Sequence, residues 1–253
     1  MKLTKWYYDL VSDTGQVLIG YAVILKLFGL TIPWRACFFW DNENSIFEQG
    51  IGRFQSIEND ELLLFTVPHT RLQGQWQKST QTRVSHLLHN DRIHVAWQGL
   101  SINACAKIEL NGQKIKGMGY VERLDLSFKT AHLPFRKLSW GRFIEETGQQ
   151  LLVWIQFDGA HATTQIFDGV QYYDEATICQ QSVIYPGGVL EMSLERDLLE
   201  TRIASHVPGL LEKMFGGSIV SGHESKWLSR GLLKNNATGQ LYKGWVIHEE
   251  VKW

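Results

Sequence analysis

Alternation of apolar and polar positions is the main pattern along the chain. Val17, Ile19, Tyr21, Val23 and Leu25 fall on one face of a run with a period of two, which is the period of a β-strand. Short runs of the same kind recur at 34–40, 62–67, 94–97, 104–110, 119–126, 151–157, 163–167, 189–194 and 240–248. The pattern therefore predicts many short strands.

Turn-forming residues separate many of these runs. Asn111-Gly112, Asp158-Gly159 and Asp168-Gly169 are pairs that favour tight hairpins. Only two stretches, 81–89 and 208–215, have the apolar spacing of a helix, and both are short. Many strands with a few short helices predict an all-β fold, built as antiparallel barrels or sandwiches.

The sequence also repeats itself. The pattern G-Q-x-x-K-G-x-x-x-x-E occurs at 112–122 and again at 239–249, an offset of 127. A second block pairs Trp6 and the turn at 14–16 with Trp140 and the turn at 147–149, at an offset of 133 to 134. Hairpins reuse glycine and polar residues by chance, but the preserved order favours a duplication. We place the boundary within 127–139, which gives domains 1–128 and 129–253.

Composition and charge exclude several classes of protein. The chain is 44% hydrophobic and carries a net charge of −1, so we expect neither nucleic acid nor an anionic membrane as a partner. Cys37, Cys105 and Cys179 are odd in number and far apart, which favours a reducing compartment over a disulfide framework. The first residues lack the apolar core of a signal peptide, and the stretch 17–25 is too short for a bilayer. We expect a cytoplasmic protein without a transmembrane segment.

Motifs of the common enzyme classes are absent from the sequence. There is no G-x-S-x-G elbow, no glycine-rich phosphate loop, no C-x-x-C pair and no H-E-x-x-H helix. Hydrolase, kinase, dehydrogenase and metalloprotease activities therefore lose their usual support.

Several segments resemble a known superfamily. They are the opening residues 5–10 (K-W-Y-Y-D-L) followed by Gly15, the G-M-G-Y-V-E segment at 117–122, and 139–143 (S-W-G-R-F). Together they are similar to the carotenoid 1,2-hydratase (hydroxyneurosporene synthase) and AttH-type lipocalin-like superfamily. The resemblance implies two tandem lipocalin-like (calycin-type) domains and a non-polar ligand. Members hydrate or cyclise isoprenoids, and fungal Diels-Alderase-like relatives direct cycloadditions. Here a longer stretch separates Glu122 from Trp140, so an Asp or His pair of the family is not carried over.

Hydration of an alkene, or cyclisation of a polyene, needs a proton donor in a dry site. A carboxyl group kept protonated by burial can supply the proton. Our candidates for the acid are Glu122, in the family-like segment, and Asp158, which follows Trp154; Asp41 and Glu249 are further acidic residues near a Trp. The alternative for Glu122 is a structural ion pair with a neighbour such as Arg123.

Aromatic faces stabilise a developing cation and line apolar pockets, and 12% of the residues are aromatic. The predicted ligand-binding residues are Tyr120, Trp140, Arg142, Trp154, Trp40 and Trp97. Arg142 could hold a carboxylate or carbonyl of the ligand, or its stem could pack against a Trp as part of the core. The Trp residues could likewise be core.

Histidines are the remaining candidates for chemistry. His86, His89 and His94 could be metal ligands with Asp91, but no fourth ligand is placed by spacing, and surface histidines on a helix and loop are the simpler interpretation. Nothing in the sequence separates an acid–base role from simple exposure at His69 and His161. We expect no metal and no cofactor.

Two hypotheses for function follow. The first is a cofactor-independent hydratase or cyclase, of lyase or isomerase type, whose reaction is acid-catalysed or pericyclic. Its substrate would be a hydrophobic polyene, terpenoid or polyketide-like molecule in an aromatic-lined pocket. The second is a lipocalin-like carrier that binds such a molecule without reaction; a module for protein interaction is a third. The partner in the first two is a small hydrophobic molecule, expected near the boundary between the halves.

Overall fold

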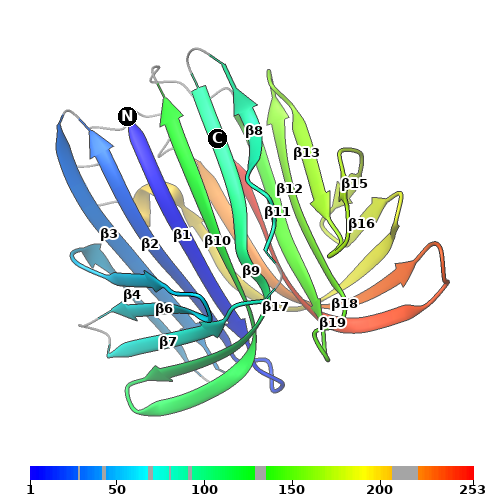
Figure 1. Ribbon diagram of the computed structural model, residues 1–253, viewed down its shortest axis with the longest axis horizontal. Helices are drawn as coiled ribbons and strands as arrows, with labels where there is room; N and C mark the ends of the chain where they lie inside the picture. Colours follow the sequence, from blue (N-terminus) through cyan, green and yellow to red (C-terminus); the bar gives the residue numbers. More distant parts are fainter. Residues whose placement is uncertain are drawn as a thin grey trace. The chain divides into compact units, whose positions relative to one another are not determined.

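The computed structural model describes residues 1–27, 29–41, 44–67, 71–79, 81–90, 93–128, 135–206 and 222–253, and most of them lie in strands. The all-β prediction is confirmed. The chain divides into two compact units, Met1–Lys129 and Thr130–Trp253, each formed around one curled antiparallel sheet (Figure 1).

The sheet of the first unit has the strand order β4-β3-β2-β1-β10-β9-β7-β6-β5, and β8 pairs with β9. Its strands are β1 (Lys2–Val11), β2 (Val17–Leu27), β3 (Leu30–Trp40), β4 (Ser45–Ile51), β5 (Gln55–Glu58), β6 (Leu62–Val67), β7 (Leu72–Gln77), β8 (Ser85–His89), β9 (Ile93–Leu110) and β10 (Gln113–Phe128).

The sheet of the second unit has the order β14-β13-β12-β11-β19-β18-β17-β16-β15. Its elements are β11 (Phe135–Glu145), β12 (Leu151–Gly159), β13 (Thr163–Phe167), β14 (Tyr172–Tyr173), β15 (Thr177–Cys179), β16 (Ser182–Tyr185), β17 (Gly188–Arg202), the 3-10 helix η1 (Ile203–His206), β18 (His223–Asn235) and β19 (Leu241–Lys252). Apart from β8, the two orders correspond strand for strand, as a duplication requires.

The register of the strands corrects one equivalence drawn from the sequence. Tyr7 lies opposite Glu122, and Trp140 lies opposite Glu249, so Trp140 corresponds to Tyr7 at an offset of 133. Trp6 corresponds to Ser139 instead. The difference of one residue matters because it moves a side chain to the other face of the sheet.

The recurring glycines have a structural cause. Gly112 and Gly239 sit in the hairpin turns with φ of +85° and +69°, which a residue with a side chain rarely adopts. A Cβ on Gly117 would lie 2.1 Å from the backbone oxygen of Val11, and one on Gly244 would lie 2.1 Å from that of Ile144. The repeat therefore marks a backbone contact that both units need.

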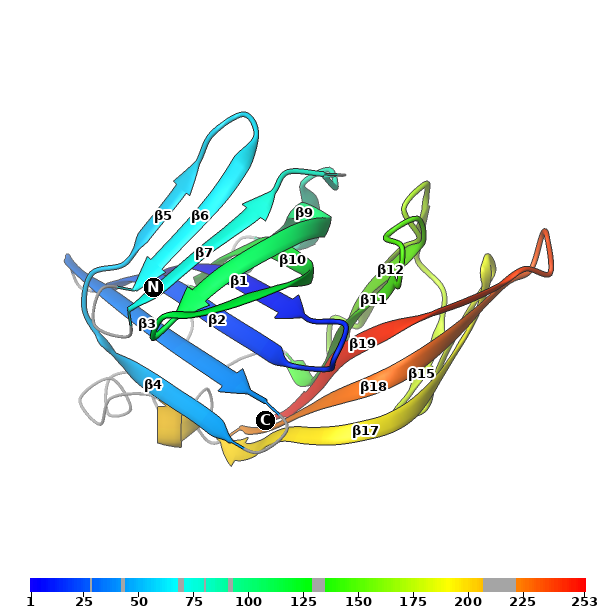
Figure 2. The ribbon, with the colours of Figure 1, turned by 90° about the horizontal axis from the view of Figure 1, so that it is seen from below.

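Each sheet curls around its own apolar core. In the first unit, Tyr8 on β1 stacks on Phe65 of β6, with ring centroids 4.6 Å apart, and the Trp76 indole of β7 donates to the backbone oxygen of Asp9 at 2.6 Å. Figure 2 shows β5, β6 and β7 turned towards the face of β1 and β2. The core of the second unit contains Phe143, Trp154 and neighbours on β12, β13 and β16 to β19.

One predicted helix is a strand. Residues 85–89 form β8, and a bulge between His86 and Leu88 breaks the alternation there. An irregular strand of this kind places apolar residues at a spacing that resembles a helix. The other predicted helix, 208–215, lies outside the described residues.

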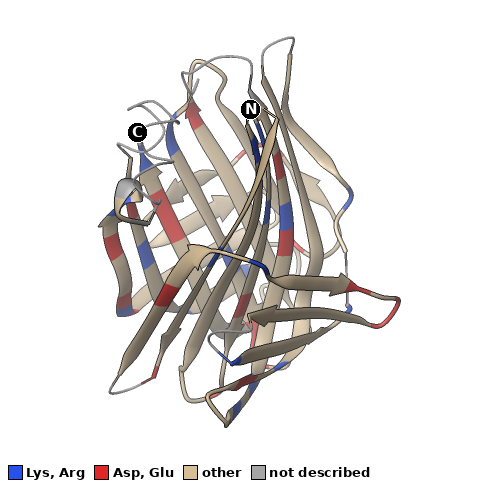
Figure 3. Ribbon diagram, turned by 90° about the vertical axis from the view of Figure 1, so that its left-hand side faces the viewer, with Lys and Arg blue, Asp and Glu red and all other residues tan. Residues whose placement is uncertain are grey.

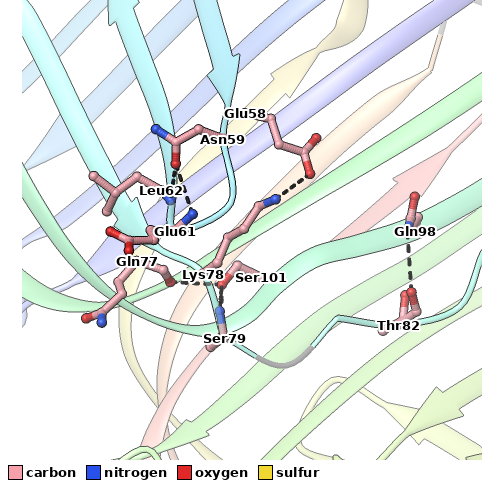
Figure 4. Close-up of polar contacts among 10 residues, drawn as sticks. All are labelled: Glu58, Asn59, Glu61, Leu62, Gln77, Lys78, Ser79, Thr82, Gln98 and Ser101. Atoms are coloured by element: carbon pink, nitrogen blue, oxygen red, sulfur yellow. Dashed lines mark hydrogen bonds and ion pairs between the residues drawn. The ribbon is translucent and has the colours of Figure 1, made fainter.

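Lys and Arg alternate with Asp and Glu along the outer strands, and neither sign dominates the face seen in Figure 3. Polar side chains also fix strand ends. Ser101 on β9 donates to the backbone oxygen of Gln77 and accepts from the backbone N–H of Ser79, which holds the end of β7 against β9 (Figure 4).

Candidate functional site

Two neighbouring strands of the first unit place two carboxyl groups on one buried face. Tyr7 and Asp9 on β1 lie directly opposite Glu122 and Tyr120 on β10, so all four side chains share a face of the sheet. Their exposed fractions are between 0% and 3%. Because Tyr8 and its neighbours form the core on the other face, this face is a second buried layer that contains ionisable groups.

Glu122 is held by two hydrogen bonds at the same oxygen. The Trp97 indole N–H donates to Oε2 of Glu122 at 2.6 Å, and the Tyr120 hydroxyl donates to the same atom at 2.9 Å. Irregularities in the pairing of β9 with β10 lie next to Tyr120 and Glu122. The structure thus brings together three of the residues selected from the sequence.

Electrostatics keep Tyr120 protonated. Burial, followed by the negative charge of Glu122 and its hydrogen bond, raises the pKa of Tyr120 well above its usual 10, and Asp9 adds to the rise. A phenol in these surroundings stays neutral and acts as a hydrogen-bond donor.

Aromatic rings continue this face across the neighbouring strands. The ring centroids are 6.1 Å apart for Tyr120 and Tyr7, 5.4 Å for Tyr7 and Tyr21, and 6.0 Å for Tyr21 and Phe38. Phe38 also stacks against Trp40 at 5.7 Å. These ring separations are typical of aromatic pairs.

The same rings already contact a cation. The ammonium group of Lys5 lies 5.5 Å from the centre of the Tyr21 ring and 6.0 Å from that of Tyr7. Distances of this size allow a cation–π attraction. The row of rings can therefore stabilise positive charge.

The remaining predicted residues belong to the second unit. Trp140 and Arg142 share one face of β11 and are 3% and 0% exposed. Trp154 projects to the opposite face, where it packs over Gly141 in the core; a Cβ on Gly141 would lie 2.2 Å from the Trp154 ring. Trp154 is thus separated from Trp140 and Arg142 by the sheet.

Asp158 is exposed to solvent at the end of β12, opposite Lys137. It lacks the dry surroundings that a neutral carboxyl acid requires. Glu122 is the better placed of the two proposed acids.

The residues of these buried layers that were not selected from the sequence include Tyr7, Asp9 and Lys226. Lys226 is 2% exposed and forms ion pairs with Glu249 and, at 2.7 Å, with Glu224. The sequence did contain a signal for Asp9, because this charged residue lies among large apolar side chains in the strand 2–11. The sequence contained no such signal for Lys226, because its ion pair with Glu249 depends on the pairing of β18 with β19, which joins residues far apart in the sequence.

A cavity of about 440 Å³ lies elsewhere, between the β6–β7 turn and the β9–β10 hairpin. Its lining mixes polar and apolar side chains and includes Arg71, Gln73, Glu109 and Leu72. Glu122 is ten residues along β10 from this hairpin, or about 33 Å at the usual strand rise, so the two are separate sites. In the described ranges, no helix has the length and apolar character needed to cross a membrane.

Comparison with solved structures shows several proteins of the same architecture. A protein from Nitrosomonas europaea described as an AttH aligns with a TM-score of 0.59 at 12% sequence identity. The alignment covers 100% of this chain and 92% of the other. CghA with Sch210972 gives 0.58 at 8% identity, and kievitone hydratase from Nectria haematococca gives 0.52 at 10%; each alignment covers 99% of this chain and 88% of the other. The chain has the fold of these proteins.

The resemblance seen in the sequence is therefore confirmed at the level of the fold. No protein-family model matches the chain, and no curated protein matches its sequence. Sequence identities of 8% to 12% show only that the fold is shared. The chemistry of this chain depends on its own residues.

Proposed function

We propose that the chain is a cofactor-independent hydratase or cyclase for a small hydrophobic polyene, terpenoid or polyketide-like molecule, with Glu122 as its acid. The observation that carries the proposal is the buried Glu122 carboxyl, held at one oxygen by Trp97 and Tyr120. The two donors fix the carboxyl, and a fixed group in low dielectric is suited to proton transfer.

The proposed reaction uses Glu122 in its protonated form, in which the carboxyl no longer places a negative charge beside Tyr120. It begins with transfer of that proton to one carbon of a C=C bond. The π electrons form the new C–H bond, and the other carbon becomes a cation. Rings such as Tyr7 and Tyr21 stabilise that charge, as they attract Lys5. In a hydratase, water then bonds to the cation and returns a proton to Glu122. In a cyclase, a second C=C bond of the substrate bonds to the cation, and a neighbouring carbon returns the proton.

The second unit supports the choice of Glu122. Glu249 occupies the equivalent position but pairs with the cation of Lys226, which favours its ionised form. Glu122 has neutral donors there instead. The fold shared with kievitone hydratase, a hydratase by its name, agrees with this class of activity.

Turnover assays on the full chain test the proposal. The purified protein is incubated with a panel of polyenes and terpenoids in water enriched in ¹⁸O, and products are analysed by mass spectrometry. Addition of labelled water identifies a hydratase, and an isomer of unchanged mass identifies a cyclase.

Variants then locate the acid. We expect Glu122→Gln to lower kcat at least about 100-fold while the ligand still quenches Trp fluorescence. The matched control is Glu191→Gln, an exposed Glu on β17, which should retain activity. Full activity in Glu122→Gln would overturn the assignment. Tight binding with no product in the unaltered protein would indicate a carrier.

A further inference from the structure

Three imidazole rings converge on one face of the β8–β9 hairpin, on the opposite side of β9 from Trp97. His89 and His94 are direct cross-strand partners, and His86 lies opposite Ala96, two residues along β9. The bulge between His86 and Leu88 brings His86 and His89 to the same side. In a regular strand, residues three apart would point to opposite faces.

The rings lie within the reach of a single ion. Their centroids are 5.1 Å apart for His89 and His94, 5.3 Å for His86 and His94, and 6.3 Å for His86 and His89. A metal bound to one ring nitrogen at 2.0–2.1 Å lies about 3.2 Å from the ring centre, so two rings on one ion have centroids at most about 6.4 Å apart. All three observed separations fall below this limit.

The two facing nitrogens also fit a particular coordination geometry. Nδ1 of His89 and Nδ1 of His94 are joined by a hydrogen bond of 2.9 Å, and a bound ion would take the place of its proton. Two nitrogens at that separation, each about 2.05 Å from an ion, subtend an angle of about 90° at it. A tetrahedral site would need them about 3.3 Å apart, whereas 90° is the angle of the square-planar or tetragonal sites that Cu²⁺ and Ni²⁺ prefer.

We propose that His89 and His94 bind a divalent transition-metal ion, Cu²⁺ or Ni²⁺, with His86 as a third ligand. Within the described ranges, no three His, Cys, Asp or Glu side chains are arranged to hold one metal ion. The His86 ring therefore has to turn before it can act as the third ligand. His86 is exposed to solvent.

One carboxylate lies near the cluster. Asp125, on β10 opposite Ala96, adds a negative charge near His94 and also pairs with Arg123 at 2.8 Å.

Metal titration of the untagged full chain tests the site. Protein treated with a chelator and dialysed is titrated with CuCl₂ or NiCl₂ by calorimetry. We expect one equivalent to bind, and His89→Ala and His94→Ala each to weaken its binding at least about tenfold. His86→Ala should cause a smaller loss. His161→Ala changes an exposed histidine of the second unit and is the matched control, with unchanged binding.

The electron paramagnetic resonance spectrum of the Cu²⁺-loaded chain is a second readout. We expect hyperfine splitting from two or three nitrogens, with one fewer in His89→Ala or His94→Ala. Circular dichroism of each variant checks that the chain remains folded. If the double variant His89→Ala/His94→Ala bound Cu²⁺ and Ni²⁺ as tightly as the unaltered chain does, the proposal would be overturned.

Discussion

Glu122 and Glu249 occupy equivalent positions in β10 and β19, 127 residues apart, and have different partners. The Trp97 indole and the Tyr120 hydroxyl donate to Glu122, whereas the ammonium group of Lys226 pairs with Glu249. Both carboxyls are buried. The two units thus keep a buried glutamate at the same position and stabilise it by different means. Four predictions concern these and other buried contacts.

The first prediction concerns the hydrogen bond from Trp97. Trp97→Phe removes a donor from the buried Glu122, and we expect the free energy of unfolding to fall by about 1–3 kcal/mol beyond the packing loss. The control is Trp34→Phe, because the Trp34 Nε1 atom is buried without a hydrogen-bond partner. Urea denaturation measures both, and equal losses would contradict the role of the Trp97 bond.

The second prediction concerns the buried ion pairs of Lys226. Lys226→Met leaves Glu249 without its cation, and we expect a loss of about 3–5 kcal/mol of unfolding free energy. The double variant Lys226→Met/Glu249→Leu should recover part of it. For comparison, Lys78 and Glu58 pair at 2.8 Å with Glu58 half exposed (Figure 4), and Lys78→Met should cost at most about 1 kcal/mol. Similar costs for the two Lys variants would be inconsistent with a buried ion pair.

The third prediction is a pH dependence caused by His248. Its Nε2 lies 3.0 Å from the Ser229 hydroxyl, and burial lowers its pKa to about 4. In the unfolded chain the value is about 6.5, so between pH 4 and 6.5 the unfolded chain binds more protons than the folded one. The stabilisation is present above pH 6.5 and is lost as the pH falls towards 4, by about 3 kcal/mol in all.

Urea midpoints between pH 7.5 and 4.5 measure this dependence. His248→Gln should flatten the curve, because its side chain does not titrate. His223→Gln alters an exposed histidine at the start of β18 and should leave the slope as it is. An unchanged slope in His248→Gln would assign the dependence to other groups.

The fourth prediction concerns Gly141, which lies beneath Trp154. Gly141→Ala would place a Cβ 2.2 Å from the Trp154 ring, and we expect a loss of about 1–3 kcal/mol from displaced packing. Gly50→Ala, on β4, meets nothing within 4 Å and should change stability by less than about 0.5 kcal/mol. Thermal unfolding of both variants gives the comparison.

Much of the fold could be predicted from local pattern. The runs at 62–67 and 163–167 coincide with β6 and β13, because the period-two signal is strong where one face is buried. The runs at 94–97 and 104–110 are parts of one long strand, β9, which local alternation could not join across Gly99 and the pairing irregularities. Bulges alter the period itself, and this also made β8 look helical.

The candidate site was predictable in part for the same reason. Glu122, Tyr120 and Trp97 were selected separately, and strand pairing explains why they meet. The faces were harder to assign: Trp154 was selected for ligand binding but packs in the core, since its orientation depends on the register of β12. Whether Trp40, Trp140 and Arg142 contact a ligand stays a prediction.

The glycines of the closing hairpins limit how the two halves can diverge. Gly117 and Gly244 leave no room for a side chain, and Gly112 and Gly239 need a left-handed backbone, so these sites tolerate little mutation in either copy. The other positions of these strands are not limited in this way. That is where Tyr120 faces Asp9 in one half and Ile247 faces Arg142 in the other. A frame fixed by these four glycines leaves each half able to change the side chains of its buried face without losing the pairing of its closing strands.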